Sequence, residues 1–352
     1  MSGEATPALR EVLGRLIEGQ NLSPDEMAAV VGGIMDGAGS PAQVGALLAA
    51  FRMKGETVDE VVGAALAMRQ RMQRVPLAAQ VGEEVMDTCG TGGDGSGSVN
   101  ISTLASFILA GCGVRVAKHG NRALSSKSGS HDVIEALGLD PAPSAEVAAR
   151  CLLEANLCFM FAPAFHAATK AVAVPRREVG FRTLFNLLGP LTNPAGARVH
   201  LNGVFAQDRC AFLARAHKAL GSRRALVVHG QGGLDEIAPA GPTHVAELTE
   251  GGEIREYQIT LDDFGLPEQD PAGLRGGEPA RNARILREAL EGAPGAVRVS
   301  AVATAAAGLR VAGLVRDLRE GAARARQSLD EGAALGVLQK LERLSPRPTP
   351  SP

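Results

Sequence analysis

The sequence predicts an α/β protein in which a small all-helical domain precedes a larger domain with a mainly parallel central sheet. Two observations support this fold class. Residues 1 to about 75 show helical periodicity without a strand signal, and from about residue 81 short apolar runs alternate with helical segments. Repeated strand–loop–helix units are typical of a parallel sheet with helices on its faces. We therefore expect a helical domain at 1–75 and an α/β domain formed by 76–164 and 191–344.

The composition is that of a globular protein without a global charge bias. The 352 residues are 45% hydrophobic and 21% charged, with a net charge of −2. This length is sufficient for a large core and two domains. Nucleic-acid binders usually carry a basic face, and base stacking uses aromatic side chains, which make up only 3% of this chain. The composition therefore argues against a nucleic-acid partner.

Cysteine usage and hydropathy favour a cytoplasmic protein without a membrane partner. The five cysteines are odd in number and show no CxxC spacing, so we expect reduced, mostly buried thiols. No secretory signal is evident at the N-terminus. The most apolar run, 299–315, contains Arg310 and many small residues, which favours a buried helix over a membrane span.

The first domain is expected to contain four helices. Apolar residues recur at helical spacing from Leu9 to Ile17. Ser23-Pro24 and Ser40-Pro41 each combine an N-cap serine with a first-turn proline, and Thr57 begins a capping box. Nothing in these helices is chemically unusual, so a structural or dimerisation role is expected. The predicted helices cover 9–17, 24–35, 41–51 and 57–68.

The second domain is expected to alternate strands and helices. Helical material at 165–190 should pack on the first domain, and the tail 345–352 should be disordered. In such sheets ligands bind beyond the carboxyl ends of the strands, so the loops that follow strands should converge. The predicted strands are 85–86, 115–117, 157–161, 201–206 and 225–228; the helices are 101–110, 130–137, 144–155, 208–220, 279–290 and 299–341; and a β-hairpin at 244–264 turns at Gly251-Gly252.

Two loops between residues 87 and 130 are candidates for binding phosphate. The first, 90–95, is rich in glycine, and the second, 118–127, contains three cations and several hydroxyl groups. No acidic residue lies between Gly95 and His131. Glycine allows backbone amides to approach a ligand closely, and amides with cations suit a phosphate-rich ligand.

Two common nucleotide-binding motifs do not fit these loops. GTGGDG at 90–95 satisfies the loose GxGxxG pattern, but a dinucleotide fold needs an acid about 20 residues later, where Arg115 and Lys118 stand. The phosphate-binding P-loop needs a glycine before its lysine, and Ser126 precedes Lys127. The alternative of two loops without a ligand is weakened by their succession in adjacent strand–helix units.

Two further motifs could contribute to the same site. Asp235-Glu236, after the strand at 225–228, could hold Mg²⁺ or could be an ordinary exposed turn. Arg176-Arg177 could clamp a carboxylate or could lie on a helix surface. For His166 no partner residue can be identified, so a structural role is favoured over a catalytic one. No nucleophile–base signature is evident, so the site is suited to positioning and charge neutralisation.

Five motifs in order resemble those of the anthranilate phosphoribosyltransferases of tryptophan biosynthesis. They are GTGGD, NIST, KHGNR-x-x-SSKSGS, RRE-x-G-x-RT-x-FN-x-LGPLTNP and GLDE. The resemblance covers nearly the whole chain. It implies a nucleoside phosphorylase/phosphoribosyltransferase-like fold, a homodimer formed through the helical domain, and Mg²⁺. It also implies transfer of phosphoribose from phosphoribosyl diphosphate to the amine of anthranilate, with release of diphosphate.

The resemblance also implies three sets of site residues, and it assigns no residue as a general acid or base. Ser102, Asp235 and Glu236 would ligate Mg²⁺. Gly90, Asn121 and Arg176 would hold anthranilate, with Arg176 reaching its carboxylate. Phosphoribosyl diphosphate would contact Gly90, Gly93, Asp94, Ser98, Asn100, Ile101, Ser102, Thr103, Lys118, His119, Gly120, Asn121, Arg122, Ala123, Leu124, Ser125, Ser126 and Ser130.

The chain departs from the family pattern at a few positions around the expected anthranilate side. Val174-Pro175 stands where Pro-Val is common, and His131 stands where a small residue is usual. Ala167 and Thr169 also differ from the residues that are usual in the HPAMK motif of the family. These departures bear on anthranilate affinity more than on the reaction.

Two alternative functions are less favoured. Pyrimidine nucleoside phosphorylases share the fold, but their glycine loop begins with a lysine where this chain has Thr88. A non-enzymatic nucleic-acid-binding relative would need a basic surface and eroded loops, whereas the net charge here is −2 and the loops are intact.

Overall fold

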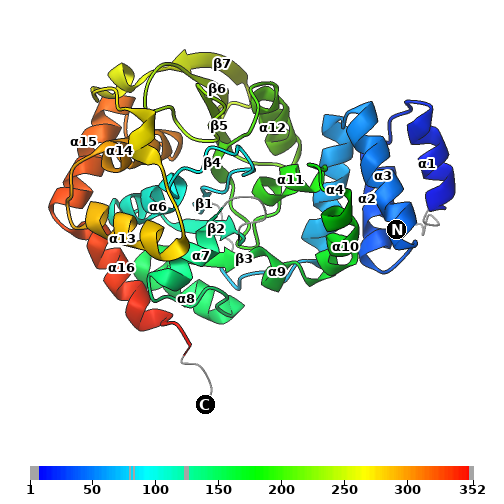
Figure 1. Ribbon diagram of the computed structural model, residues 1–352, viewed down its shortest axis with the longest axis horizontal. Coiled ribbons are helices and arrows are strands. Elements are labelled where there is room, and N and C mark those ends of the chain that lie inside the picture. The colour runs from blue at the N-terminus through cyan, green and yellow to red at the C-terminus, as the bar shows by residue number, and fades with distance from the viewer. Residues whose placement is uncertain (1–7, 79–80, 82–83, 123–126, 349–352) are drawn as a thin grey trace.

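The computed structural model describes residues 8–78, 81, 84–122 and 127–348. A helical bundle lies beside a larger body of helices around a sheet, as Figure 1 shows. The predicted fold class is therefore confirmed.

The helices of the bundle begin where the sequence predicts them. Ser23, Ser40 and Thr57 each accept a backbone N–H from three residues later, and the side chain at that position bonds back, which completes three capping boxes. The caps satisfy N–H groups that the first turn would otherwise leave unpaired. The four helices are α1 (Leu9–Ile17), α2 (Pro24–Met35), α3 (Pro41–Lys54) and α4 (Val58–Arg71).

A segment far along the chain completes the bundle. Helix α10 (Lys170–Val179) packs on α3 and α2, and its Val172 is fully buried in the bundle core. Gly180 then adopts φ 69° and ends α10. Short pieces make up the remainder of the helical material expected at 165–190: α9 (Ala162–Phe165), α11 (Phe185–Leu188) and the 3₁₀ turns Ala167–Thr169 and Gly189–Leu191.

The sheet has seven strands in the order β3-β2-β1-β4-β5-β6-β7. The five strands from β3 to β5 pair in parallel, and β6 and β7 form the predicted antiparallel hairpin, in which Gly252 has φ 78°. The strands are β1 (Met86–Asp87), β2 (Val116–Gly120), β3 (Leu157–Phe161), β4 (Val199–Gly203), β5 (Arg224–Gly230), β6 (Thr243–Leu248) and β7 (Ile254–Ile259).

The sheet separates two apolar cores. Leu226 and Val228 of β5 belong to the larger core. The intervening Val227 belongs to the second core, which also includes the buried side chains of the helical bundle. This alternation is the two-residue period of a strand covered on both faces. Helix α12 (Asp208–Ala219) packs on the bundle side. On the larger core lie α6 (Ile101–Gly111), α7 (Ser130–Ala136), α8 (Ala145–Ala155), α13 (Pro279–Leu290), α14 (Ala296–Val311), α15 (Leu318–Asp330) and α16 (Ala333–Leu344), with 3₁₀ turns at Leu261–Phe264 and Pro271–Leu274.

Two predictions about the limits of segments are wrong, and one helical segment is divided. The helical material predicted at 299–341 forms three helices, separated at Gly313 and Gly332, which both have φ 75°. The strand predicted to reach residue 206 ends at Gly203, where the chain turns toward α12. The tail is ordered at its start, because Ser345 and Arg347 bond the backbone at Asp140 and Gly138; residues 349–352 lie outside the described structure.

Two of the compositional expectations can be compared with the described residues. All five cysteines are free and buried, as predicted. Among the described helices, none combines the length and the apolar character that a membrane crossing requires.

Candidate active site

A cleft of about 680 Å³ opens at the carboxyl ends of β1, β2, β4 and β5. It is lined by the glycine loop, by residues 118–122 at and just after the end of β2, by Asp235 and Glu236 after β5, and by Arg176 of α10. The loops that follow the strands therefore converge, as the sheet geometry predicted.

The glycine loop is held by backbone contacts on both sides. Thr91 N–H donates to the carbonyl of Gly203 at 2.9 Å, and Gly97 accepts the N–H of Gly276 at 2.8 Å. A Cβ on Gly90 would lie 3.1 Å from the Gly203 oxygen and 3.5 Å from Asp235 Oδ2. Gly93 has φ 78°, a conformation that disfavours other residues. The loop thus needs glycine both for space and for backbone conformation.

Lys118 lies with its buried ammonium group at the floor of the cleft. It is only 3% exposed, and its Nζ donates to the Thr88 carbonyl at 2.9 Å, to Thr88 Oγ1 at 3.2 Å and to Ser102 Oγ at 3.2 Å. Burial lowers the pKa of Lys118, and the acids around it oppose that shift. Lys118 thereby places positive charge beside the first turn of α6, where the helix dipole already favours an anion.

The acidic pair lies opposite that lysine. Glu236 Oε1 accepts the backbone N–H of Ser102 at 3.0 Å. Burial raises the pKa of Glu236 to about 7, and Lys118 opposes the shift. Burial and the nearby carboxylates of Asp94 and Glu236 raise the pKa of Asp235 well above its usual range. Asp94 Oδ2 is also buried, and its close neighbour is the carboxyl group of Asp235 and not a basic side chain.

These three carboxylates are therefore short of compensating positive charge. Mg²⁺ binds oxygen ligands and commonly takes one or two carboxylates together with phosphate oxygens. The donor set of Asp235, Glu236 and the Ser102 hydroxyl fits such an ion, whose charge would offset both the burial and the repulsion that raise the pKa of Asp235.

The other end of the cleft suits an aromatic acid. The Arg176 guanidinium lies 5.2 Å from the centre of the Phe185 ring and is half-buried. Burial lowers the pKa of Arg176. Within the described part of the chain no carboxylate contributes to that shift or pairs with Arg176, whereas its neighbour Arg177 is exposed. The lining of the cleft also includes apolar and small residues, namely Met68, Ala162 and Pro163.

Three buried histidines lie near the cleft and are held neutral. Burial lowers the pKa of His119 to about 4, and that of His131 and His166 to about 3. The rings of His119 and His166 are 5.0 Å apart, and both residues line the cleft. His131 instead packs on Phe161 at 5.1 Å between ring centres and does not line the cleft. His131, which departs from the family pattern, can therefore affect the cleft indirectly, through its contact with Gly120.

Most predicted site residues that the structure describes line this cleft. Arg122 lines it, but its guanidinium pairs with Asp132 at 3.0 Å and with Glu135 at 2.8 Å. Ile101 does not, because its side chain lies in the core and is 1% exposed. Ala123, Leu124, Ser125 and Ser126 lie outside the described residues. The predicted residues that line the cleft are Gly90, Gly93, Asp94, Ser98, Asn100, Ser102, Thr103, Lys118, His119, Gly120, Asn121, Arg122, Ser130, Arg176, Asp235 and Glu236.

Sequence reasoning missed several residues that support the glycine loop. The Arg182 guanidinium donates to the Gly93 carbonyl and stacks over Phe205. Arg275 lines the cleft, and Asn282 Nδ2 donates to Asn100 Oδ1 at 3.1 Å. Arg182 lies in one of the family motifs, but no sequence signal links Arg275 or Asn282 to a loop at least about 180 residues earlier.

Comparisons with known proteins point to one family. Residues 82–335 match the model described as the glycosyl transferase family a/b domain, and residues 10–72 match the model of its helical bundle domain. An anthranilate phosphoribosyltransferase from Anaeromyxobacter sp. strain K is 51% identical over 333 residues, which are 95% of this chain and 97% of the relative.

Solved structures of the same enzyme share the fold. A crystal structure of anthranilate phosphoribosyltransferase from Thermus thermophilus is 38% identical, with a TM-score of 0.87 over 94% of this chain and 98% of the other. The Saccharomyces cerevisiae enzyme in complex with PRPP and Mg is 26% identical, with a TM-score of 0.87 over 96% of this chain and 97% of the other.

Proposed function

Because this chain belongs to the anthranilate phosphoribosyltransferase family, we propose that its cleft carries out the family's reaction with the residues described above. The enzyme is a glycosyltransferase of the pentosyl-transferring kind. It transfers the phosphoribosyl group of 5-phosphoribosyl 1-diphosphate to the amine of anthranilate. The products are N-(5-phosphoribosyl)anthranilate and diphosphate, and the reaction is the second step of tryptophan synthesis from chorismate.

One observation supports the proposed site above all others. One end of a single cleft contains the glycine loop and Lys118, which suit a phosphate group. The other end contains Arg176, which is half-buried and lacks an acidic partner among the described residues. A phosphorylated sugar donor and a small aromatic acid need these two ends at reacting distance.

Phosphoribosyl diphosphate would bind at the first end. Gly90, Gly93 and Ser98 would offer backbone and hydroxyl donors, while Asn100, Ser102 and Thr103 lie at the start of α6, where the dipole favours anions. The ammonium of Lys118 would oppose the phosphate charge from the cleft floor. Arg122 would have to exchange its pairing with α7 for a phosphate.

Mg²⁺ would be held by Asp235, Glu236 and the Ser102 hydroxyl, and would neutralise the diphosphate as it leaves. The Asp235 carboxylate, crowded by Asp94 and Glu236, supplies the charge for such an ion. The S. cerevisiae relative was solved with Mg and PRPP, which supports use of the same ion here.

Anthranilate would bind at the second end. Arg176 would pair with its carboxylate in a bidentate fork, and the Phe185 ring would hold the guanidinium in orientation. Gly90 and Asn121 would contact the ring and amine. Because the leaving diphosphate gives the anomeric carbon oxocarbenium character, the amine needs chiefly to be held in line. An in-line attack inverts the anomeric centre, and no residue is assigned to remove the amine proton.

The assembly and location of the enzyme are part of this proposal. We expect a homodimer formed through the helical bundle, which leaves Ile17 and Met53 exposed at 69% and 87%. We also expect a cytoplasmic enzyme, consistent with its five free, buried cysteines.

The test of the function is direct. Purified protein with phosphoribosyl diphosphate, Mg²⁺ and anthranilate should consume the fluorescence of anthranilate and release diphosphate. Folded protein that leaves the fluorescence unchanged would refute the proposed function. A parallel reaction with a pyrimidine nucleoside and phosphate should release no base, whereas release would favour the phosphorylase alternative.

A further inference from the structure

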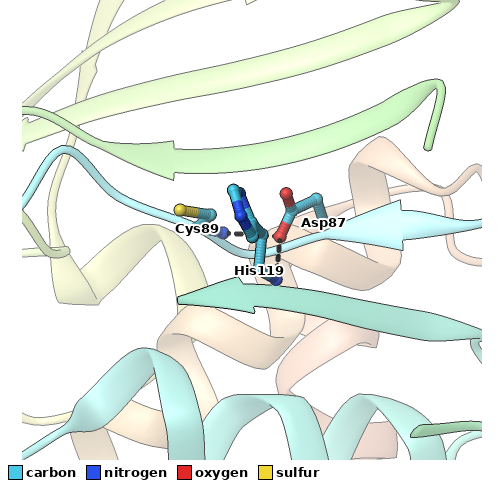
Figure 2. A group of neighbouring side chains, drawn as sticks. All are labelled: Asp87, Cys89 and His119. Carbon is cyan, nitrogen blue, oxygen red and sulfur yellow. Dashed lines mark hydrogen bonds between the residues drawn. The ribbon is translucent and has the colours of Figure 1, made fainter. Parts of the chain in front are cut away.

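Three potential ligands for a metal ion cluster beneath the two loops of the cleft. Asp87 ends β1, Cys89 follows two residues later, and His119 lies in β2. One ligand atom of each lies within 4.8 Å of the other two. Figure 2 shows the imidazole between the thiol and the carboxylate. Ligands of one tetrahedral ion are about 3.3–3.8 Å apart, so a contraction of about 1 Å would complete a site.

The carboxylate and the imidazole each keep one atom available. Asp87 Oδ1 accepts the backbone N–H groups of Cys89 and His119 at 3.0 and 3.2 Å. Asp87 Oδ2 is buried, and although the Asn193 side chain lies close enough to lower the pKa of this carboxyl group, no described donor makes a full hydrogen bond to Oδ2. A buried acceptor without a partner is costly and indicates a missing ion or water.

The imidazole is fixed in a form that can bind metal. His119 Nδ1 is 3.0 Å from the carbonyl oxygen of Gly189, which can only accept a hydrogen bond, so Nδ1 carries the proton. Nε2 therefore holds a lone pair, and it too is buried without a partner among the described residues. A carbonyl that orients the second nitrogen is the usual outer contact of a metal-binding histidine.

We propose that Asp87, Cys89 and His119 form a binding site for a soft divalent cation of the Zn²⁺ class, distinct from the Mg²⁺ site. A thiolate, an imidazole and a carboxylate are zinc ligands, whereas Mg²⁺ prefers oxygen. Three protein ligands leave one coordination position open. Cys89 and His119 line the cleft, which provides the route of entry.

Binding at this site has a chemical cost and a mechanical consequence. Burial raises the pKa of the Cys89 thiol above its usual range, so the cation must displace the thiol proton, which is released to water. The nearby Lys118 ammonium repels the cation and limits its affinity. Cys89 directly precedes Gly90, and Lys118 directly precedes His119, so an ion here would pull on both loops and reduce activity.

The test uses Co²⁺ alone as a spectroscopic probe on the full-length protein, without Mg²⁺ or substrates. We expect one equivalent of Co²⁺ to give a near-ultraviolet thiolate-to-cobalt absorption that Zn²⁺ abolishes. Cys89→Ser should lose this band, and His119→Gln should weaken it. Cys210→Ser, which alters a buried cysteine in α12, should retain it. Melting curves should establish that each variant is folded.

Two results would overturn the proposal: no band with Co²⁺ in excess, or an unchanged band in Cys89→Ser. Asp235→Asn should keep the band, which separates this site from the Mg²⁺ site. In the assay with saturating Mg²⁺, Zn²⁺ should inhibit the parent at least about tenfold more strongly than Cys89→Ser. If Zn²⁺ binds at the site but does not inhibit the enzyme, then the bound ion does not alter the two loops as proposed. Because Co²⁺ binding is read without turnover, its failure is distinct from failure of the proposed function.

Discussion

The backbone N–H of Ser102 donates to Glu236 Oε1 across 3.0 Å, although the two residues are 134 positions apart. The hydroxyl of the same serine accepts a hydrogen bond from Lys118 Nζ at 3.2 Å. Ser102 therefore joins the acidic and the basic parts of the cleft at the first turn of α6. This relationship gives the metal and phosphate ends of the proposed site a common anchor.

Substitution of Asp235, the first acid of the pair, should weaken the binding of Mg²⁺. In Asp235→Asn the Mg²⁺ concentration for half-maximal activity should rise by about tenfold or more, because a carboxylate ligand is lost. Asp208→Asn, at an exposed acid on α12, is the matched control and should leave the Mg²⁺ dependence unchanged. An equal Mg²⁺ dependence in parent and Asp235→Asn would exclude this carboxylate as a ligand.

The second acid should give the metal-free enzyme a distinctive pH dependence. The pKa of Glu236 is raised from 4.5 to about 7 in the folded protein. The folded state then binds more protons than the unfolded chain between these values, so the free energy of unfolding falls as pH rises from 4.5 to 7. The loss is at most about 3.5 kcal/mol, since the pKa rises by about 2.5 and one pKa unit corresponds to about 1.4 kcal/mol.

Melting curves at pH 5 and pH 8 without Mg²⁺ would measure this effect. Glu236→Gln, which carries no titrating carboxyl group, should lose less stability between the two pH values than the parent. Mg²⁺ should raise the Tm of the parent more at pH 8 than at pH 5, because the ion binds the ionised carboxylates. Parallel profiles for parent and variant would contradict the raised pKa.

The arginine pair should separate into one functional and one dispensable residue. Arg176→Ala should raise the KM for anthranilate by about tenfold or more, the loss expected for a charged hydrogen bond, and change that for phosphoribosyl diphosphate much less. Arg177→Ala, at the exposed neighbour, is the control. Phe185→Leu should act in the same direction as Arg176→Ala but more weakly. Equal changes in both KM values would refute the assignment of Arg176.

Gly203 should be essential for the position of the acidic pair. A Cβ at residue 203 would overlap the carbonyl oxygen of Asp235, so Gly203→Ala must displace that backbone. We expect a loss of kcat/KM of about a hundredfold and a weaker response to Mg²⁺. Gly336→Ala, at a helical glycine with no atom within 4 Å of the added carbon, should be fully active. Full activity of Gly203→Ala would show that the loop after β5 adapts.

The sequence determined much of the fold because its signals are local. The capping residues Ser23, Ser40 and Thr57 begin helices through bonds that span three residues, and the apolar run at 157–161 coincides with β3. The order of strands and helices then implied a parallel sheet, and the family motifs named the residues of the cleft. Limits set by single glycines, such as the breaks at Gly313 and Gly332, were beyond the periodicity.

Only the tertiary structure decided which groups share an environment. Burial, and the approach of Asp94 to Asp235, raise the pKa of the acidic pair, and neither property can be read from the motif. The burial of Ile101, the support of Asn100 by Asn282, and the meeting of Asp87, Cys89 and His119 likewise depend on how β1, β2 and α6 pack. Local sequence sets backbone preference, whereas charge and metal affinity depend on neighbours that only the folded chain brings together.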